Sequence, residues 1–264
     1  MSKRARSAAT VQPAGKKTRS AATVQPSSKK KPRRANIAST GTSDSAGATD
    51  TTETTSAATA TLLAPLAAAY APVDAYAVAR AERSRQRAEG VYRDGIQYGE
   101  IDAASFARCL EWVAPIADGE AFFDLGSGSG KAVLTAALLH PFGSATGIEI
   151  QPALHAAALD ARRRLDAAAA PLRAASVELR CGDAFAADAA WPDEAGVVFC
   201  TTTCFTPELR AALLRGVARL RDGARLIVTT QALESPRLTL LRRDSLPYAK
   251  GSLQFFAYRV GSAG

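Results

Sequence analysis

A glycine-rich run behind an acid is the part of the sequence best suited to chemistry. Residues 122–130 read FFDLGSGSG, with glycines at alternate positions after Asp124. Glycine lets a backbone approach a ligand closely, and a helix that starts after such a loop offers unpaired N–H groups. Such loops bind phosphates, dinucleotides or adenosine-containing cofactors, depending on their spacing.

The spacing excludes the first two kinds of ligand. A phosphate-binding P-loop needs G-x-x-x-x-G-K-S/T, whereas position 125 is Leu and Lys131 is followed by Ala132. The dinucleotide fingerprint has glycines at relative positions 1, 3 and 6, whereas here they fall at 1, 3 and 5. The form that remains is D-x-G-x-G-x-G.

Two acids farther along the chain complete this form. Glu149 is placed to accept two hydrogen bonds from ribose hydroxyls, and Asp124 to reach a ligand's amino group; both contacts would be charge-assisted. Within residues 181–185, CGDAF, Asp183 can accept from an adenine amino group and Phe185 can stack on the ring. The ordered set favours S-adenosylmethionine as cofactor. A generic nucleotide site and a purely structural turn remain the alternatives.

The elements that must position these residues alternate along the chain. Short apolar runs at 121–125, 145–150, 177–181, 197–200 and 226–230 predict strands, separated by helices at 131–140, 152–167 and 207–220. This rhythm is typical of a mostly parallel sheet covered on both faces, and it brings the acids to one edge. Residues 238–242 and 252–260 have no helix between them, which predicts an antiparallel hairpin and an α/β fold of seven strands.

The charge is concentrated at the N-terminus. Residues 1–35 hold eleven basic side chains and no acid, so the remainder has 33 − 11 = 22 basic against 25 acidic residues, a net of −3. Residues 6–13, RSAATVQP, recur at 19–26, and residues 29–34 read KKKPRR. This arm at residues 3–34 predicts contact with DNA or another polyanion, or a nuclear localisation signal. A solvated tail and an organelle transit peptide are the alternatives.

Composition divides the chain into three parts. The totals of 47% hydrophobic and 22% charged residues exclude full-length disorder and a collagen-like fibre. We expect a disordered basic arm at 1–35, a disordered Ser/Thr/Ala linker at 36–65 and one domain at 66–264 with a helical lead-in. The lead-in helix should span about 73–89 and end at Gly90. Its arginines are expected to face solvent: Arg80, Arg83, Arg85 and Arg87.

The cysteines and the apolar runs indicate in which cellular compartment the protein works. Cys109, Cys181, Cys200 and Cys204 include no CxxC pair and no His at metal-ligand spacing, which argues against a zinc site and a disulfide scaffold. A reduced intracellular compartment fits best. The longest mostly apolar stretch, residues 62–73, is interrupted by prolines and is shorter than the roughly 20 residues of a membrane span. We therefore expect no metal, no membrane and no secretory signal.

With these residues in view, residues 98–258 resemble a class I methyltransferase, and more narrowly the non-SET histone lysine methyltransferases of the disruptor of telomeric silencing (Dot-one) family. The cofactor loop and the helix after it, FFDLGSGSGKAVLTAALL, are similar to those of the family. The run Tyr98-Gly99-Glu100 stands before the first strand, where the family closes a loop over the methionine part of the cofactor. Residues 197–209, VVFCTTTCFTPEL, resemble its fourth strand and catalytic loop.

The resemblance implies a Rossmann-like fold and two sets of site residues. Tyr248 and Phe255 have the separation of two aromatics that line the family's lysine channel. The residues expected around the acceptor are Thr201, Thr202, Phe199, Phe205, Tyr248 and Phe255. Those expected at the cofactor are Tyr98, Glu100, Asp124, Gly126, Ser127, Gly128, Gly130, Lys131, Glu149, Asp183 and Phe185.

The chain departs from the family in its acceptor half. Animal and fungal members carry an Asn pair and an aromatic at positions 201–203, a Gln at Lys131 and a Trp at Tyr248. A Thr hydroxyl cannot reproduce the paired groups of an amide.

The resemblance implies a nuclear enzyme that uses S-adenosylmethionine to methylate a lysine in the core of histone H3 in nucleosomes. Two alternatives stay open for function: methylation of a non-histone protein or small molecule, and a catalytically inactive chromatin or nucleic-acid binding module. The cytoplasm or an organelle is the alternative location.

Overall fold

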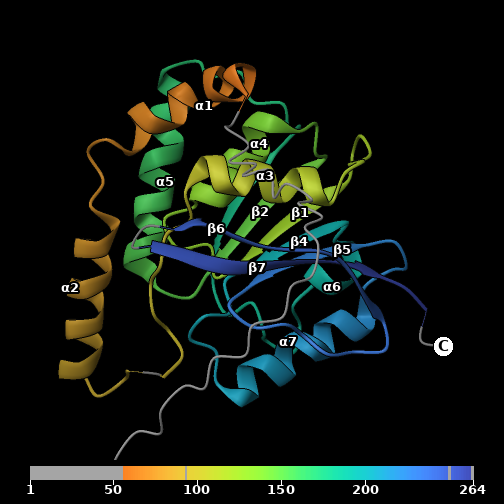
Figure 1. The fold of residues 1–264 in the computed structure, drawn as a ribbon. Coiled ribbons are helices and arrows are strands. Elements are labelled where there is room, and N and C mark those ends of the chain that lie inside the picture. Colours follow the sequence, from red (N-terminus) through yellow and green to blue (C-terminus); the bar gives the residue numbers. More distant parts are fainter. Residues whose placement is uncertain (1–55, 93, 249–250, 263–264) are drawn as a thin grey trace, which may run out of the picture. The chain divides into compact units, whose positions relative to one another are not determined.

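A computed structural model describes residues 56–92, 94–248 and 251–262 of the 264. These residues form a seven-stranded sheet with helices on both faces (Figure 1). The elements are α1 (Ala57–Tyr70), α2 (Ala75–Ala88), α3 (Ala103–Trp112), β1 (Ala121–Leu125), α4 (Lys131–Leu139), β2 (Ser144–Glu149), α5 (Pro152–Ala167), β3 (Val177–Cys181), α6 (Trp191–Glu194), β4 (Val197–Cys200), α7 (Pro207–Arg219), β5 (Arg225–Thr229), β6 (Leu238–Tyr248) and β7 (Gly251–Val260).

The strand order is β3-β2-β1-β4-β5-β7-β6. Strands β1 to β5 pair in parallel, while β7 pairs antiparallel with both β5 and β6. From β1 the chain moves outward to β3 on one side, and it then returns to build β4 and β5 on the other. Open α/β sheets bind ligands at such a reversal, outside the carboxyl ends of the strands. The predicted fold class, including the C-terminal hairpin, is confirmed.

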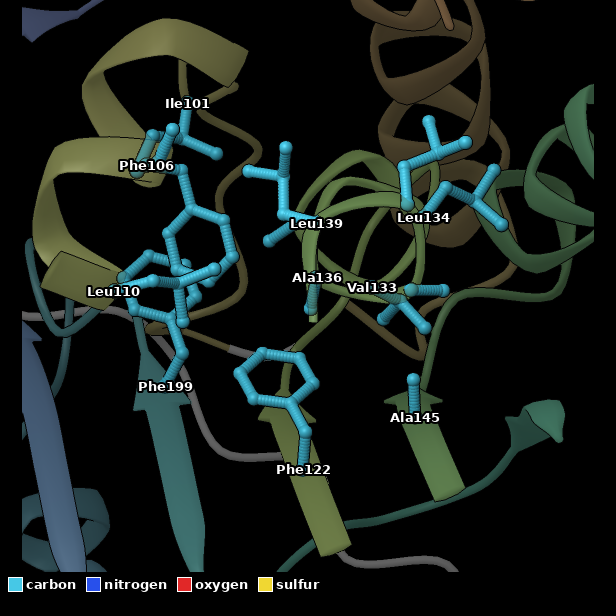
Figure 2. Close-up of a cluster of buried hydrophobic side chains, with 14 of the residues drawn as sticks. Ile101, Phe106, Leu110, Phe122, Val133, Leu134, Ala136, Leu139, Ala145 and Phe199 are labelled. Atoms are coloured by element: carbon cyan, nitrogen blue, oxygen red, sulfur yellow. The ribbon is translucent and has the colours of Figure 1, made fainter. Parts of the chain in front are cut away.

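Alternation along β1 separates two hydrophobic layers. Phe122 points to the layer that contains α1, α3, α4 and α5, whereas Phe123 and Leu125 point to the layer that contains α6 and α7. In the first layer, Phe122 lies below Ala136 and Leu139 of α4 (Figure 2). Because both faces of β1 are buried, the strand end that carries the glycine loop is held firmly.

Helix α1 corrects the expected domain boundary. Residues 57–65 were expected to belong to the linker, but they lie in a helix capped by Ser56, whose side chain accepts from the Thr59 N–H. Leu63, Leu66 and Tyr70 of α1 are buried against the domain, and this burial stabilises a helix that Ser/Thr/Ala composition alone does not predict. The domain therefore begins before residue 57. The basic arm and the rest of the linker lie outside the described residues.

The lead-in helix is confirmed as α2, which ends at Ala88 just before Gly90. Among the described residues, no single helix is long and apolar enough to cross a membrane; α1 and α2 pass that test only as a pair bent by 46°. The four cysteines are free.

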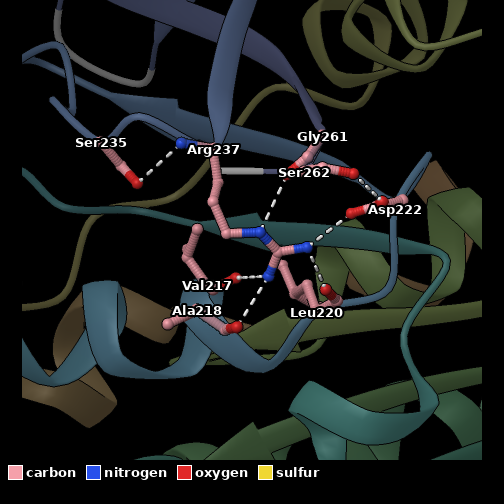
Figure 3. Close-up of polar contacts among 8 residues, drawn as sticks. All are labelled: Val217, Ala218, Leu220, Asp222, Ser235, Arg237, Gly261 and Ser262. Carbon is pink, nitrogen blue, oxygen red and sulfur yellow. Dashed lines mark hydrogen bonds and ion pairs between the residues drawn. The ribbon is translucent and has the colours of Figure 1, made fainter. Parts of the chain in front are cut away.

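Arg237 fixes the end of α7, far along the chain from the glycine loop. All five N–H groups of its guanidinium are used (Figure 3). Three of its acceptors are carbonyls at the C-terminus of the helix. The partners are the carbonyls of Val217, Ala218, Leu220 and Gly261 and the carboxylate of Asp222.

Candidate active site

The glycine loop turns back on the end of β2. The N–H groups of Gly126 and Ser127 both donate to the Ile148 carbonyl, at 2.9 and 3.1 Å. Gly128 has φ +54°, and a Cβ there would stand 2.5 Å from the Tyr98 ring. Position 128 therefore tolerates only glycine, because both its backbone angle and the close approach of Tyr98 exclude a side chain.

Glu149 at the end of β2 locks this loop in place. Its carboxylate accepts from the Gly128 N–H at 2.7 Å and from the Gln151 N–H at 2.8 Å. Burial raises the pKa of Glu149, and the backbone donors oppose that shift. The carboxylate lines the cavity described below, so its remaining lone pairs can accept hydrogen bonds there.

Asp124 at the end of β1 is a buried carboxylate without a hydrogen-bond partner among the described residues, and only 4% of its surface is exposed. Burial raises its pKa well above the usual range, and the negative charge of Glu149 raises it further. It lines a small polar space together with Gly126, Ser127 and Thr201. A buried carboxylate of this kind needs a donor or a cation from a ligand.

A cavity of about 530 Å³ opens over the strand ends. One part of its wall comes from the ends of β2 and β3, including Glu149, Asp183 and Phe185. The other part comes from residues 201–209, which follow β4, and from Tyr248 at the end of β6. Phe185 and Phe205 meet edge to face where the two parts join, with ring centroids 5.8 Å apart. The volume is in the range of natural cofactor pockets.

The Tyr98-Gly99-Glu100 run is fastened over the glycine loop, as the resemblance implies. Glu100 accepts from the hydroxyls of Tyr98 and Ser129, at 3.0 and 3.2 Å, and forms an ion pair with Lys131 at 3.0 Å. Lys131 also lies over the ring of Tyr70, 4.8 Å from its centroid. The positive charge of Lys131 is therefore paired rather than free to repel a cationic cofactor.

Most of the residues expected at the cofactor lie where they were expected. Tyr98, Gly126, Glu149, Asp183 and Phe185 line the cavity. The adjoining polar space is lined by Glu100, Asp124, Ser127, Gly128 and Lys131.

Two residues of this set also have structural roles. A Cβ on Gly130 would meet the Ala158 side chain at 3.0 Å, so this glycine allows the start of α4 to approach α5 at Ala158 instead of facing a ligand. Asp183 accepts from the Phe185 N–H at 2.8 Å, which shapes the turn after β3.

Three of the residues expected around the acceptor line the cavity: Thr201, Phe205 and Tyr248. Gly99 packs directly on Tyr248, since a Cβ there would lie 2.5 Å from its hydroxyl oxygen. That hydroxyl is buried without a hydrogen bond of normal geometry among the described residues, although Thr201 is near enough to lower its pKa against the larger effect of burial.

The other three are corrected by the structure. The Thr202 hydroxyl donates to the Thr229 carbonyl of β5, and Thr202 is 2% exposed, so it cannot contact an acceptor. Phe255 is fully buried in the core, because hairpin pairing sets it opposite Asp244, four residues or about 13 Å along β6 from Tyr248. Phe199 packs on Phe106 with centroids 4.8 Å apart, and reaches only the small polar space (Figure 2).

One face of α2 contributes cavity residues that were not predicted from the sequence. Tyr76, Ala79, Arg80 and Arg83 line the cavity, at the spacing of successive helical turns. The expectation that all four arginines of this helix face solvent is therefore wrong for Arg83, which is half-buried, and Arg80 lies at the cavity wall. The i, i+3, i+7 pattern of Tyr76, Ala79 and Arg83 was the available signal.

The site residues fit S-adenosylmethionine. Gly126 leaves open space where a side chain would stand, with no atom within 4 Å of the position of a Cβ. The unpartnered Asp124 carboxylate suits an ammonium group, and Glu149 suits the ribose hydroxyls. Within the described ranges, His, Cys, Asp and Glu side chains form no group that could hold a metal ion.

A sheet of this order, with acids at neighbouring strand ends, defines an S-adenosylmethionine-dependent methyltransferase of the Rossmann-like class. Residues 91–247 match the family model described as "Histone methylation protein DOT1". This match covers more than half of the chain, and the chain belongs to that family. The resemblance inferred from the sequence, the methyltransferase activity and the cofactor are thereby confirmed.

Solved structures match part of this chain. An RNA methyltransferase from Salinibacter ruber, in complex with S-adenosyl-L-homocysteine, is 27% identical with a TM-score of 0.44, covering 60% of this chain and 90% of that one. TrmN from Thermus thermophilus is 20% identical with a TM-score of 0.45, covering 60% and 48%. These TM-scores are too low to bear on the substrate. A search of curated proteins found no match.

Proposed function

We propose that this chain transfers a methyl group from S-adenosylmethionine to a lysine in the core of histone H3 within nucleosomes, in the nucleus. The observation that carries the proposal is the cavity that joins Glu149 and Asp183, at the ends of neighbouring strands, to the wall formed by residues 201–209. The family match over residues 91–247 supports a histone as acceptor.

The cofactor half of the cavity binds S-adenosylmethionine and fixes its orientation. Glu149 accepts from the ribose hydroxyls, Asp124 accepts from the amino group, and Phe185 stacks on the adenine ring near Asp183. When bound, the cofactor supplies a methyl group on a positively charged sulfur. The loop of Tyr98 and Glu100 covers this half and excludes water.

The acceptor half receives the lysine amine. The transfer forms a bond from the amine nitrogen to the methyl carbon as the carbon–sulfur bond breaks, so the nitrogen must first lose its proton to water. Burial among Phe205, Tyr248 and Leu209 disfavours the charged amine and lowers its pKa. The Thr201 hydroxyl orients the nitrogen toward the methyl group, and the buried Tyr248 hydroxyl beside it fixes the direction of the Thr201 hydroxyl. Such alignment is worth about 7–11 kcal/mol in favourable cases.

Replacing Tyr248 by Phe tests this assignment. We expect kcat to fall about tenfold, the usual scale for losing one orienting hydrogen bond, while cofactor affinity stays unchanged. Thr203→Ala provides a control, because Thr203 bonds to Thr229 and Thr230 and keeps its hydroxyl away from Tyr248. Equal effects of both changes on kcat would contradict the assignment.

The basic arm at residues 3–34 lies outside the described residues, and its proposed role rests on its charge. It would hold the domain at nucleosomal DNA, where each neutralised phosphate adds about 0.9 to the slope of log affinity against log salt. The full chain should therefore methylate nucleosomes faster than a chain beginning at Thr52, which keeps α1 and the whole compact unit. Equal rates at physiological salt would dismiss this role.

The function is tested with intact nucleosomes, free histones and isotope-labelled cofactor, followed by mass identification of the modified residue. Label on one histone lysine is the expected result. The Thr residues at 201–203 favour a second candidate, methylation of a non-histone protein or a small molecule. Label in a cell extract but not in nucleosomes or free histones would establish that candidate, and cofactor binding without any transfer would establish an inactive binding module.

A further inference from the structure

Arg83 is a half-buried cation in the cavity wall that the assignments above leave without a role. Among the described residues, no hydrogen bond or ion pair engages its guanidinium. Its neighbours on α2 are different: Arg80 approaches Asp74 at 4.0 Å, and Arg85 pairs with Glu82 and Glu89. A guanidinium removed from part of its water is costly unless an anion meets it.

Arg83 faces the acceptor half of the cavity. Its positive charge reaches the Cys204 thiol, where burial raises the thiol pKa and Arg83 partly opposes that shift. Gly95 packs on the same wall, because a Cβ there would lie 3.3 Å from the Cys204 carbonyl oxygen and 2.7 Å from Leu209, and Arg83 lines the same cavity as these residues. The Arg83 side chain is therefore next to the residues 201–209 that would surround the acceptor amine.

The charge of this half points to the chemistry of the acceptor. An unpaired cation repels a charged lysine and thereby favours its neutral, reactive form. It also attracts a carboxylate, which a guanidinium can hold through two parallel hydrogen bonds. Asp94 lines the same cavity without pairing with Arg83, so a group with one negative charge fits better than a doubly charged phosphate.

We propose that Arg83 determines specificity by binding the carboxylate of an acidic side chain that neighbours the methylated lysine. This inference deepens the proposed function and rests on it for the identity of the acceptor amine. It predicts that an acceptor with Asp or Glu beside its lysine binds better than an acceptor with the corresponding amide.

The test measures binding of two lysine peptides that differ only in Asp against Asn next to the lysine. Fluorescence anisotropy with the full chain and saturating S-adenosylhomocysteine gives the affinities without turnover. The wild type should prefer the Asp peptide about tenfold, as for a partly buried charge pair, and added salt should shrink the preference. Arg83→Ala should remove the preference, and Arg83→Glu should reverse it.

The matched control is Arg87→Ala, on an exposed position of the same helix that stacks on Tyr92 outside the cavity. It should keep the wild-type preference, and Arg83→Ala should keep the wild-type cofactor affinity within about twofold. Equal wild-type binding of both peptides, binding of neither, or a preference that survives Arg83→Ala would overturn the proposal. These outcomes are separate from failure of the proposed function, which appears as nucleosomes that gain no methyl group on lysine.

Discussion

The two halves of the cavity are built in different ways. In the cofactor half, Asp124 and Glu149 end neighbouring parallel strands and the glycine loop joins the first strand to its helix. In the acceptor half, the wall comes from α2, residues 94–97, residues 201–209 and Tyr248, which are far apart in sequence. Residues of a short sequence pattern thus bind the cofactor, whereas the packing of distant segments forms the acceptor site.

Because of this difference, cofactor binding and acceptor choice depend on different parts of the fold. Cofactor binding depends on strand register, which the sheet core fixes through pairs such as Asp124 with Gly147. Acceptor choice depends on how α2 lies against α5 through Ala79 and Leu154. Changes in one half should therefore leave the other half's affinity intact, and the predictions below test that separation.

The largest effect is expected for Glu149→Gln. The amide keeps the shape of the side chain but loses the charge that strengthens its hydrogen bonds to ribose hydroxyls, so cofactor affinity should fall roughly 100-fold or more. Calorimetric titration of S-adenosylmethionine measures this change. Peptide affinity should stay near the wild-type value.

Glu178→Gln is the matched control, since Glu178 lies on the outer strand β3 and pairs with Arg180 at the surface. It should leave cofactor affinity unchanged. A loss in Glu149→Gln no greater than that in the control would mean that this carboxylate does not bind the cofactor.

The next largest effect is expected on stability, and it should leave cofactor and acceptor affinity unchanged. Arg237→Ala removes five hydrogen bonds at the end of α7, some of which water can replace, so we expect a loss of about 2–3 kcal/mol in the free energy of unfolding. Urea denaturation measures it. Arg215→Ala, an exposed change on the same helix, should shift stability by less than about 0.5 kcal/mol. If the folded Arg237→Ala variant lost cofactor affinity, the claim that cofactor binding is independent of this region would be wrong.

The pH dependence should differ between the free and the cofactor-bound protein. The raised pKa of buried Asp124 means that the folded protein holds a proton more tightly than the unfolded chain, whose Asp pKa is about 3.9. This contribution to stability is fully present below about pH 3.9 and is lost as pH rises through the raised pKa. Over the same range the ionised carboxylate binds a cationic cofactor better, by up to about tenfold per pH unit.

Thermal melts across about pH 4 to 8, with and without S-adenosylmethionine, check both trends. Asp124→Asn should flatten both. Cofactor affinity that weakens as pH rises in this range would contradict the role of Asp124.

The smallest effect lies outside both halves. Ala169 follows the end of α5 with φ +50°, so Ala169→Gly should stabilise the fold by about 1 kcal/mol. Ala167→Gly, inside the same helix, should instead destabilise it by about 0.5–1 kcal/mol. Urea denaturation of both variants checks the opposite signs. Two losses of similar size would show that the left-handed conformation at residue 169 carries no strain.

The sequence predicted the cofactor half better than the acceptor half for a physical reason. The glycine loop, Glu149 and Asp183 lie within short patterns whose spacing along strands sets their place in space. Thr202 and Phe255 were misplaced because a one-residue alternation and a four-residue register shift decide whether a side chain meets the cavity or the core. Arg83 was missed because its exposure depends on what packs against α2.

The start of the domain shows the same limit. Ala and Leu occupy most positions of α1, so no alternation of polar and apolar residues marks it as a surface helix of the domain, and burial of Leu66 and Tyr70 stabilises it against the domain. The strands and α2, by contrast, carry their periodicity and end signals in their own residues, and they were predicted to within one or two residues except for β6, which begins at the predicted residue but runs on to Tyr248.

Calorimetric titration of the folded, full-length protein with S-adenosylmethionine tests the central claim most directly. Carboxylates at the ends of β1 and β2 should produce saturable heat with one molecule bound per chain, and S-adenosylhomocysteine should compete for the same site. A titration with neither compound giving heat would contradict the account.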